Sequence, residues 1–182
     1  MQEVDVVKAA KIFATRAHDG QTRKWTGDPY IVHPEHVVFL LESPLFPKEL
    51  VPKEALAAAW LHDTVEDTDV TLEDVTDAFG GRVSALVFWL TDTTNLKDGN
   101  RAARKNIARD RLAKAPVEAQ CVKVADIMAN AASIAEHDRN FWKVFRNEVA
   151  QDIEAMDKVP IEIRKVALDM LHFYDWLWEV KH

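Results

Sequence analysis

The amino-acid sequence predicts an all-α fold, a compact bundle of roughly eight helices. Three observations support this prediction: apolar residues recur at helical spacing, alternating strand-like patterns are scarce, and capping residues or glycines separate the periodic segments. The chain has 182 residues, of which 48% are hydrophobic. This length suits one sizeable core better than two, so we expect residues 1–182 to form a single domain.

The helices are expected in a regular order along the chain. Thr71 and Asp74 are spaced for a capping box, and the pair Gly80-Gly81 is expected to end the helix that begins there. The segments with helical periodicity are about 4–14, 34–41, 54–65, 71–79, 82–90, 101–113, 117–135, 140–156 and 160–180.

Two long polar connections interrupt this pattern. They read "HDGQTRKWTGDPYIVHP" and "TDTTNLKDGN". Loops of this length in a compact helical domain are commonly functional, so both are expected to contribute to a site. A third connection, "ESPLFPKELVPK", holds three prolines and is expected to act as a rigid spacer.

Composition limits the partners of this chain. Its formal net charge is −7, which argues against nucleic-acid binding but allows a small anionic ligand. No run reaches the ~18 apolar residues of a membrane span, and the N-terminus is charged where a signal peptide is apolar. We therefore expect a cytoplasmic protein without membrane attachment. The single cysteine, Cys121, is expected to be a buried structural thiol rather than a nucleophile.

The C-terminal segment "LHFYDWLWEV" carries aromatic residues at near-helical spacing. Packing against the core is the expected role of this stripe. A seam between two copies of the chain, in a homodimer, is the alternative.

A cluster of polar residues follows the apolar run 57–61 in "AAAWLHDTVEDTDV". It contains His62, Asp63, Glu66 and Asp67. On a helix, residues three or four apart share a face, so these side chains would lie together. Three carboxylates this close repel one another unless a cation offsets their charge. A divalent metal bound by imidazole and carboxylate would do so; a solvated acidic helix end is the alternative.

Two residues from other segments suit the same metal. His33 lies at a loop-to-helix junction, where Pro34 fits the first helical turn. Asp126 is a charge within an otherwise apolar helical segment, which buried helices seldom carry without a partner. Two histidines and two aspartates are typical ligands of manganese or iron, whereas zinc more often recruits a further histidine or cysteine.

Four segments of the sequence resemble those of a known family in order and spacing. They are "HDGQTRKWTGDPYIVHP", "AAAWLHDTVEDT", "TLEDVTDAFGGRV" and "VKVADIMAN". The chain is similar to the HD-domain hydrolases of the RelA/SpoT-homologue family, and most of all to the single-domain small alarmone hydrolases. The resemblance covers about 5–155, and 160–180 is expected to be a helix packed against this part.

The resemblance implies a reaction and a set of site residues. The reaction is removal of the 3′-pyrophosphate from guanosine tetra- or pentaphosphate, giving GDP or GTP and pyrophosphate, with one Mn²⁺ that iron or zinc could replace. Glu66 and Asp67 match the catalytic pair; we expect Glu66 to be the acid/base and Asp67 to orient water or metal, although spacing does not decide which carries the proton. The residues that match the metal ligands are His33, His62, Asp63 and Asp126.

The resemblance also implies substrate contacts. Arg23 and Lys24 match a basic pair that contacts the substrate, and a guanidinium suits phosphate oxygens. Asn130 matches a nucleotide-binding residue. A solvated surface role is the alternative for the remaining candidates, which are Lys123, Ser133, Lys97, Arg104 and Lys105.

One position departs from the family pattern, and another leaves the base of the substrate undetermined. Ile127 stands where the family commonly has a basic residue. This difference bears on how the substrate phosphates, or the groups around the metal ligands, are arranged, and not on the ligands themselves. Trp25 is expected either to stack on a nucleobase or to cover the core, so adenosine 3′-pyrophosphates remain an alternative substrate. A phosphohydrolase of a different nucleotide, such as NADPH or a deoxynucleotide, and a non-catalytic nucleotide sensor are two further hypotheses for a site of this kind.

Overall fold

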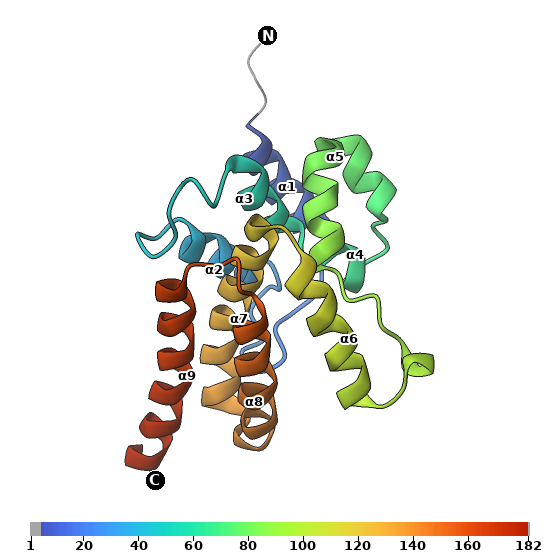
Figure 1. Cartoon of the computed structure of the whole chain (residues 1–182). Helices are drawn as coiled ribbons and strands as arrows, with labels where there is room; N and C mark the ends of the chain where they lie inside the picture. Colours follow the sequence, from blue (N-terminus) through green and yellow to red (C-terminus); the bar gives the residue numbers. More distant parts are fainter. Residues whose placement is uncertain (1–4, 182) are drawn as a thin grey trace.

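The computed structural model describes residues 5–181, which form nine α-helices and one short 3₁₀ helix, η1 (Figure 1). This part of the chain contains no β-strand, only an isolated β-bridge between Thr22 and Pro29, so the all-α prediction is confirmed. Residue 4, the expected start of the first helix, lies outside the described residues. The elements are α1 Val6–Ala17, α2 Val32–Leu41, α3 Lys53–Leu61, α4 Thr64–Asp67, α5 Leu72–Leu90, η1 Leu96–Asp98, α6 Arg101–Lys114, α7 Val117–His137, α8 Arg139–Ala155 and α9 Ile161–Lys181.

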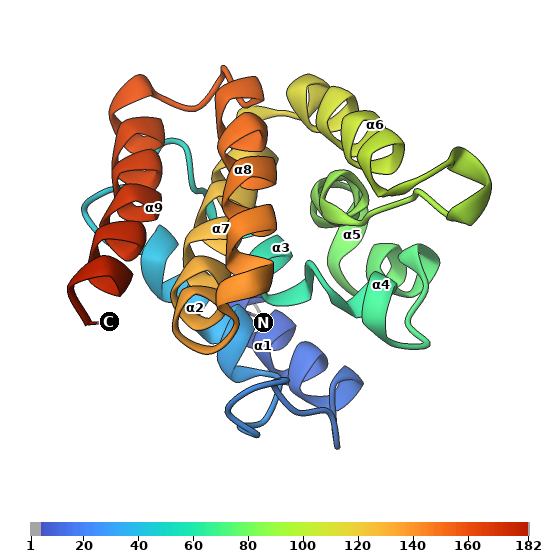
Figure 2. The same ribbon diagram turned by 90° about the horizontal axis from the view of Figure 1, so that it is seen from below.

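Helix α7 lies at the centre of the bundle. It packs against α2, α3, α5, α8 and α9, and Figure 2 shows α9 on one side of it and α5 and α6 on the other. Between Ala119 and Met128 every residue of α7 except Lys123 is buried. A helix buried on most of its faces cannot leave a carboxylate unpaired, so Asp126 in this segment requires partners from neighbouring elements.

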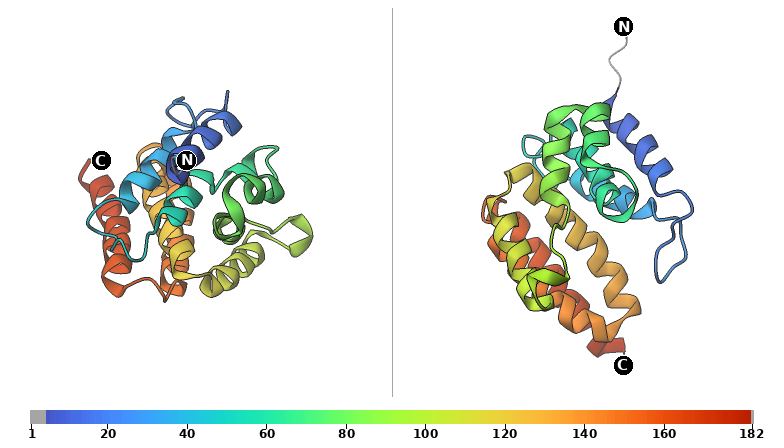
Figure 3. Two further views of the ribbon diagram at one scale, coloured as in Figure 1. Left: turned by 90° about the horizontal axis from the view of Figure 1, so that it is seen from above. Right: turned by 90° about the vertical axis from the view of Figure 1, so that its right-hand side faces the viewer.

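Helices α1, α2 and α3 form the other half of the core beside α7. The polar connection between α1 and α2 projects from the helices as a hairpin, seen in Figure 3. Its two arms are joined by backbone hydrogen bonds from Arg23 N to Asp28 O (2.8 Å) and from Tyr30 N to Gln21 O (2.9 Å). The chain therefore returns from this hairpin directly into the first turn of α2. No helix among residues 5–181 has the length and apolarity that crossing a membrane requires.

The element α5 confirms both the predicted capping box and the predicted break at the glycine pair. Asp74 N donates to Thr71 Oγ1 (3.2 Å), and Thr71 N donates to Asp74 Oδ2 (2.8 Å). Gly80, with φ 82° and ψ 165°, is not helical, so the first helical stretch ends there as predicted; a second stretch follows it, and the label α5 covers both across this kink. Across the kink, Thr76 Oγ1 donates to Ser84 Oγ (2.7 Å), which holds the two arms together.

The two neighbouring glycines of this kink are expected to respond oppositely to alanine. Gly80→Ala should reduce the free energy of unfolding by about 1–3 kcal/mol, because its backbone conformation is one that only glycine adopts readily. Gly81→Ala should leave it unchanged or raise it by up to about 1 kcal/mol, because Gly81 is helical and a Cβ there meets no atom within 4 Å. Urea denaturation of both variants tests the pair, and equal effects would contradict the kink.

The C-terminal aromatic stripe divides between core and surface. Helix α9 packs on α7 and α8, with Leu171 buried, while Trp178 Nε1 donates to Ala135 O on α7. Phe173 and Trp176 on the same helix are 51% and 54% exposed. Core packing is thus confirmed for one face of the helix, and the homodimer seam stays a prediction for the other.

Cys121 lies in the buried part of α7. Its side chain is fully buried, and burial raises the pKa of its thiol to about 12. A thiol that stays protonated at neutral pH is a poor nucleophile, which agrees with the predicted structural role.

Candidate metal and catalytic site

The apolar helix α3 ends at Leu61, and the two junction residues His62 and Asp63, which keep right-handed backbone angles, connect it to α4 and supply the centre of the site. The predicted helix over 54–65 is wrong in this respect, because α3 stops before His62 and a separate four-residue helix, α4, follows. His62 Nδ1 donates to Ala59 O (2.8 Å) and Thr64 Oγ1 donates to Leu61 O (2.7 Å). These side chains take carbonyls that backbone N–H groups would otherwise bind, so the helix ends without any glycine or proline.

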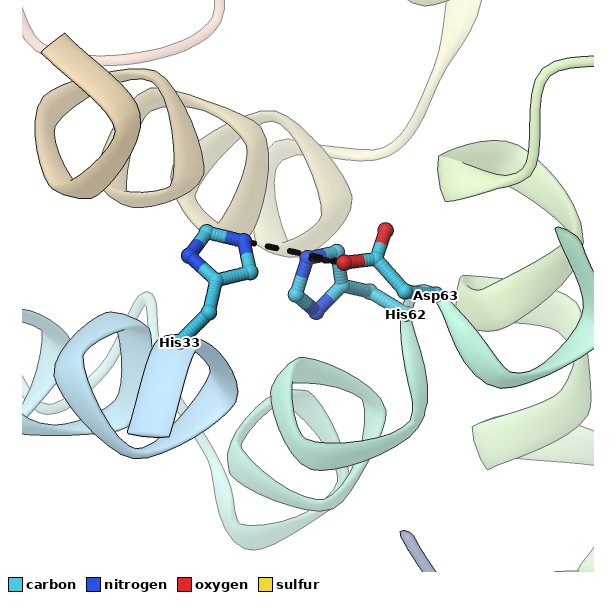
Figure 4. Close-up of side chains that lie close together, drawn as sticks. All are labelled: His33, His62 and Asp63. Carbon is cyan, nitrogen blue, oxygen red and sulfur yellow. Dashed lines mark ion pairs between the residues drawn. The ribbon is translucent and has the colours of Figure 1, made fainter. Parts of the chain in front are cut away.

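Four side chains from three elements meet beside this break. His33 comes from the first turn of α2, His62 and Asp63 from the α3–α4 junction, and Asp126 from α7. His33 Nε2 lies 3.0 Å from Asp126 Oδ1 and 3.6 Å from Asp63 Oδ2. His62 Nε2 lies 3.0 Å from Asp63 Oδ2 and 3.7 Å from Asp126 Oδ1. Figure 4 shows His33, His62 and Asp63 with their ring nitrogens and carboxylate turned toward one another.

This cluster has the chemistry and burial of a divalent-cation site. His33 and His62 are each 2% exposed and Asp126 is 5% exposed. The ligand atoms of His33, His62 and Asp63 all lie within 4.8 Å of one another. His62 Nε2 is buried and makes no hydrogen bond among the described residues, although its Nδ1 is fixed on Ala59 O. Anchoring one ring nitrogen of a histidine to a carbonyl leaves the other directed at a ligand position, a typical arrangement around bound metals.

The pKa values in the cluster follow from burial and mutual contact. Burial lowers the pKa of His33, which keeps its imidazole neutral at neutral pH. Burial alone would lower the pKa of His62, but Asp63 and Asp126 raise it well above its ordinary value. Burial likewise opposes ionisation of Asp63, and the neighbouring His62 nevertheless lowers the pKa of that carboxyl. A cation entering the cluster would therefore displace a proton from His62.

Asp126 is held by partners on every side. Lys123 Nζ donates to its Oδ2 (2.8 Å), and Asn130 Nδ2 donates to its Oδ1 (2.7 Å). Burial alone would raise the pKa of Asp126, but Lys123 and the two histidines hold it well below its ordinary value. Ile127, which replaces the family's basic residue, is 3% exposed and packs in the core. The cation near Asp126 is instead Lys123, one helical turn earlier.

Glu66 and Asp67 lie on α4, next to the cluster and more accessible than its members. Glu66 Oε2 accepts a hydrogen bond from Asp92 N (3.0 Å), the residue that follows the α5 C-cap. Asp67 Oδ2 lies 3.2 Å from Tyr30 Oη. Burial raises the pKa of both carboxyls, and the negative charge of Asp63 raises them further. The break at His62 therefore places two proton-accepting groups beside the four candidate ligands.

A pocket beside Glu66 contains some of the predicted phosphate-binding residues. Arg104 Nε is buried there and has no hydrogen-bond partner among the described residues, whereas Arg101 donates twice to Glu148 (2.8 Å each). Lys97 lies in η1 and is not among the residues that line this pocket. The lining consists of Glu66, Asp92, Thr94, Arg101, Arg104 and Lys105.

One residue of the hairpin between α1 and α2, Arg23, approaches the cluster next to Asp126. Arg23 Nη2 donates to Asn130 Oδ1 (3.4 Å), so this arginine is connected to Asp126 through one side chain. Lys24 is directed elsewhere, with Nζ 3.9 Å from Asp138 Oδ2 and 4.7 Å from the Trp25 ring centroid.

Two further candidates lie near the C-terminal half of α7: Ser133 on that helix, and Trp25, which comes from the hairpin. Trp25 is partly buried against the core. Its ring stacks on the ring of the exposed His137, with centroids 6.3 Å apart. Ser133 lies two turns beyond Asp126, and its carbonyl accepts a hydrogen bond from His137.

Sequence reasoning missed two residues that contact Asp63 or Asp67, and a third that supports them. Tyr30 Oη donates to Asp63 Oδ2 (2.6 Å), Gln21 Nε2 donates to Asp67 O (2.8 Å), and His18 pairs with Gln21. All three lie in the long polar connection whose length marked it as functional. Their types gave no further indication, because a loop tyrosine or glutamine is ordinary on a surface.

Comparison with known proteins places the chain among its relatives. It is 36% identical over 135 residues to the human guanosine-3′,5′-bis(diphosphate) 3′-pyrophosphohydrolase MESH1, covering 74% of this chain and 72% of that protein. It is 33% identical to the Vibrio cholerae guanosine-3′,5′-bis(diphosphate) 3′-pyrophosphohydrolase, covering 72% of this chain and 18% of that protein. The chain thus spans less than a fifth of the length of this bacterial relative.

Structural similarity agrees with the sequence comparison. A solved structure described as "A metazoan ortholog of SpoT hydrolyzes ppGpp and plays a role in starvation responses" has a TM-score of 0.79 and 25% identity, covering 94% of this chain and 96% of that one. Residues 10–155 match the family described as "HD domain", and this range includes all four candidate ligands. The chain therefore belongs to the HD-domain family.

Proposed function

We propose that this chain is a metal-dependent guanosine-3′,5′-bis(diphosphate) 3′-pyrophosphohydrolase. The observation that carries the proposal is the α3–α4 break, which puts Glu66 and Asp67 directly beside a buried set of two imidazoles and two carboxylates. The similarity to MESH1 over most of both chains supports the substrate class. The products would be GDP or GTP and pyrophosphate.

The proposed ligands of the metal are His33, His62, Asp63 and Asp126. Their nitrogen and oxygen atoms suit manganese, which we propose as the working ion, with iron or zinc as substitutes. When bound, a divalent ion supplies a Lewis acid that polarises a phosphoryl oxygen and makes water a stronger nucleophile. The remaining tasks belong to side chains of this protein.

Glu66 is the proposed acid/base. Its carboxylate is fixed by the N–H of Asp92, and its raised pKa brings proton exchange closer to neutral pH. It accepts a proton from the attacking water as the water oxygen bonds to phosphorus and the bond between phosphorus and the 3′-oxygen breaks, and it then gives that proton to the 3′-oxygen, which leaves as a hydroxyl. Asp67, beside it on α4, orients the water.

The proposed substrate contacts lie on both sides of these groups. The guanidinium group of Arg104 and the ammonium group of Lys105 would bind phosphate oxygens in the pocket beside Glu66. Arg23 and Asn130, joined to each other beside Asp126, would hold the nucleotide on the opposite side. Outer positions complete the proposed set, namely Lys24, Lys97, Lys123 and Ser133.

A nucleotide panel tests the substrate and the reaction together. With Mn²⁺ added, guanosine tetraphosphate should release pyrophosphate and no orthophosphate, and chelation of the metal should stop the reaction. Adenosine 3′-pyrophosphates, NADPH and a deoxynucleotide belong in the same panel, because an HD site can act on other phosphate esters. Faster turnover of one of these would reassign the substrate, and tight binding without turnover would indicate a sensor.

A further inference from the structure

Tyr30 contacts both halves of the proposed catalytic machinery. Its hydroxyl lies 2.6 Å from Asp63 Oδ2 and 3.2 Å from Asp67 Oδ2. Asp63 Oδ2 is also the oxygen that faces His33 Nε2 (3.6 Å) and His62 Nε2 (3.0 Å). One phenol thus joins a proposed metal ligand to one member of the proposed catalytic pair.

The hydroxyl of Tyr30 has one hydrogen for two carboxylates. It can donate to only one of them at a time, and the shorter contact assigns that hydrogen to Asp63. A contact of this length is typical of a strong charge-assisted bond between a hydroxyl and a carboxylate.

The ring and backbone of Tyr30 are held independently of its hydroxyl. The ring packs on that of His18, with centroids 4.6 Å apart, and His18 is 3% exposed. His18 Nδ1 lies 2.8 Å from Gln21 Oε1, and Gln21 Nε2 donates to Asp67 O (2.8 Å). Because Tyr30 N also donates to Gln21 O, the hairpin holds the end of α4 as well as Tyr30.

We infer that Tyr30 is a positioning residue, which fixes the carboxylate of Asp63 toward the two histidines and sets the orientation of Asp67 relative to it. His18 and Gln21 hold Tyr30 in place, and Gln21 additionally fixes the backbone at Asp67. The effect on turnover rests on the proposed function, whereas the effect on metal binding does not.

Tyr30→Phe tests this inference because it removes only the hydroxyl. Affinity for Mn²⁺ alone, measured by titration of the metal-free protein, should fall about 10–100-fold, as it does when the hydrogen-bond partner of a ligand is lost. At saturating Mn²⁺, kcat for guanosine tetraphosphate should fall about tenfold while KM changes by less than about threefold, because the substrate contacts are untouched. The melting temperature of the metal-free protein should stay near that of the wild type, since the ring still packs on His18.

The chain offers a matched control and an independent second variant. Tyr174 is the other tyrosine, packed against Trp142 on the far helices (5.8 Å between centroids), and Tyr174→Phe should change neither metal affinity nor turnover. Gln21→Met removes the bond to Asp67 O and the contact with His18 that supports Tyr30, so it should lower both kcat and Mn²⁺ affinity, each by less than Tyr30→Phe does. This variant carries the test if Tyr30→Phe fails to fold.

Several outcomes would overturn the inference. Unchanged Mn²⁺ affinity in folded Tyr30→Phe would do so, as would a loss that Tyr174→Phe reproduces. With Gln21→Met, wild-type turnover would overturn it. If the wild type binds Mn²⁺ but hydrolyses no alarmone, the proposed function fails, and the affinity comparison still decides the role of Tyr30.

Discussion

Replacing Glu66 with glutamine is expected to lower kcat by about 10²–10⁴-fold, the range contributed by a positioned proton-transfer group. The amide keeps the size of the side chain and an oxygen that can accept from Asp92 N, but it cannot take a proton from water. Metal content should be unchanged, because the four proposed ligands remain. Pyrophosphate release at saturating substrate and Mn²⁺, together with elemental analysis, measures both quantities.

The same substitution at Glu73 is a suitable control for Glu66→Gln. Glu73 is exposed in the first turn of α5, and Glu73→Gln should keep wild-type turnover. Near-normal rates in Glu66→Gln would show that the acid/base assignment is wrong and would direct attention to Asp67.

The dependence of the hydrolysis rate on pH is a second test of the role of Glu66. Burial raises its pKa, Asp63 adds to the rise, and the N–H of Asp92 opposes it. A base must be ionised to act, so the rate should fall as the pH drops through this raised pKa, at a higher pH than for an ordinary glutamate. At saturating Mn²⁺ this acid-side decline should disappear in Glu66→Gln. A decline on the alkaline side instead would identify Glu66 as the acid.

Replacing Asp63 with alanine is expected to abolish metal binding. Asp63 Oδ2 lies within 3.6 Å of both histidine nitrogens, so its loss removes one of two carboxylates from a buried cluster. Wild-type protein at 100 times the dissociation constant of Mn²⁺ should gain about 2.7 kcal/mol of stability, and Asp63→Ala should gain none. Thermal unfolding with and without Mn²⁺, and the metal content of purified protein, check this result.

Glu66→Gln serves as the control for Asp63→Ala, since it lies three residues away and should keep the metal and the added stability. Full metal content in Asp63→Ala would remove this residue from the ligand set. Loss of metal from both variants would mean that the division between ligands and catalytic residues is wrong.

Much of the fold follows from local features of the sequence. The capping box of Thr71 and Asp74 depends on residues three apart, so it is visible in the sequence and appears as predicted. Gly80 also acts locally, through a positive φ. How the two helical stretches that meet at Gly80 pack on each other depends on contacts across it, such as Thr76 with Ser84, which are not visible in local patterns.

The end of α3 shows where local patterns fail. The residues following the apolar run contain neither glycine nor proline, so periodicity alone extends the helix through 65. Its actual end depends on His62 and Thr64 hydrogen-bonding to carbonyls of the preceding turn. Histidine and threonine make such bonds only in particular conformations, and burial beside α2 and α7 selects the conformation here.

Residue types by themselves determined which chemistry this chain could support. Two histidines, a cluster of carboxylates and a charge within an apolar helix indicate a cation site, because such groups are costly to bury without one. Tertiary structure decided which atoms meet: Asp126 with His33 across the α2–α7 contact, and Tyr30 with both Asp63 and Asp67. It also left Lys97 out of the pocket beside Glu66. The physical reason is that residue type shows which groups need a partner when they are buried, whereas hydrogen bonds and ligand distances depend on how separate elements pack.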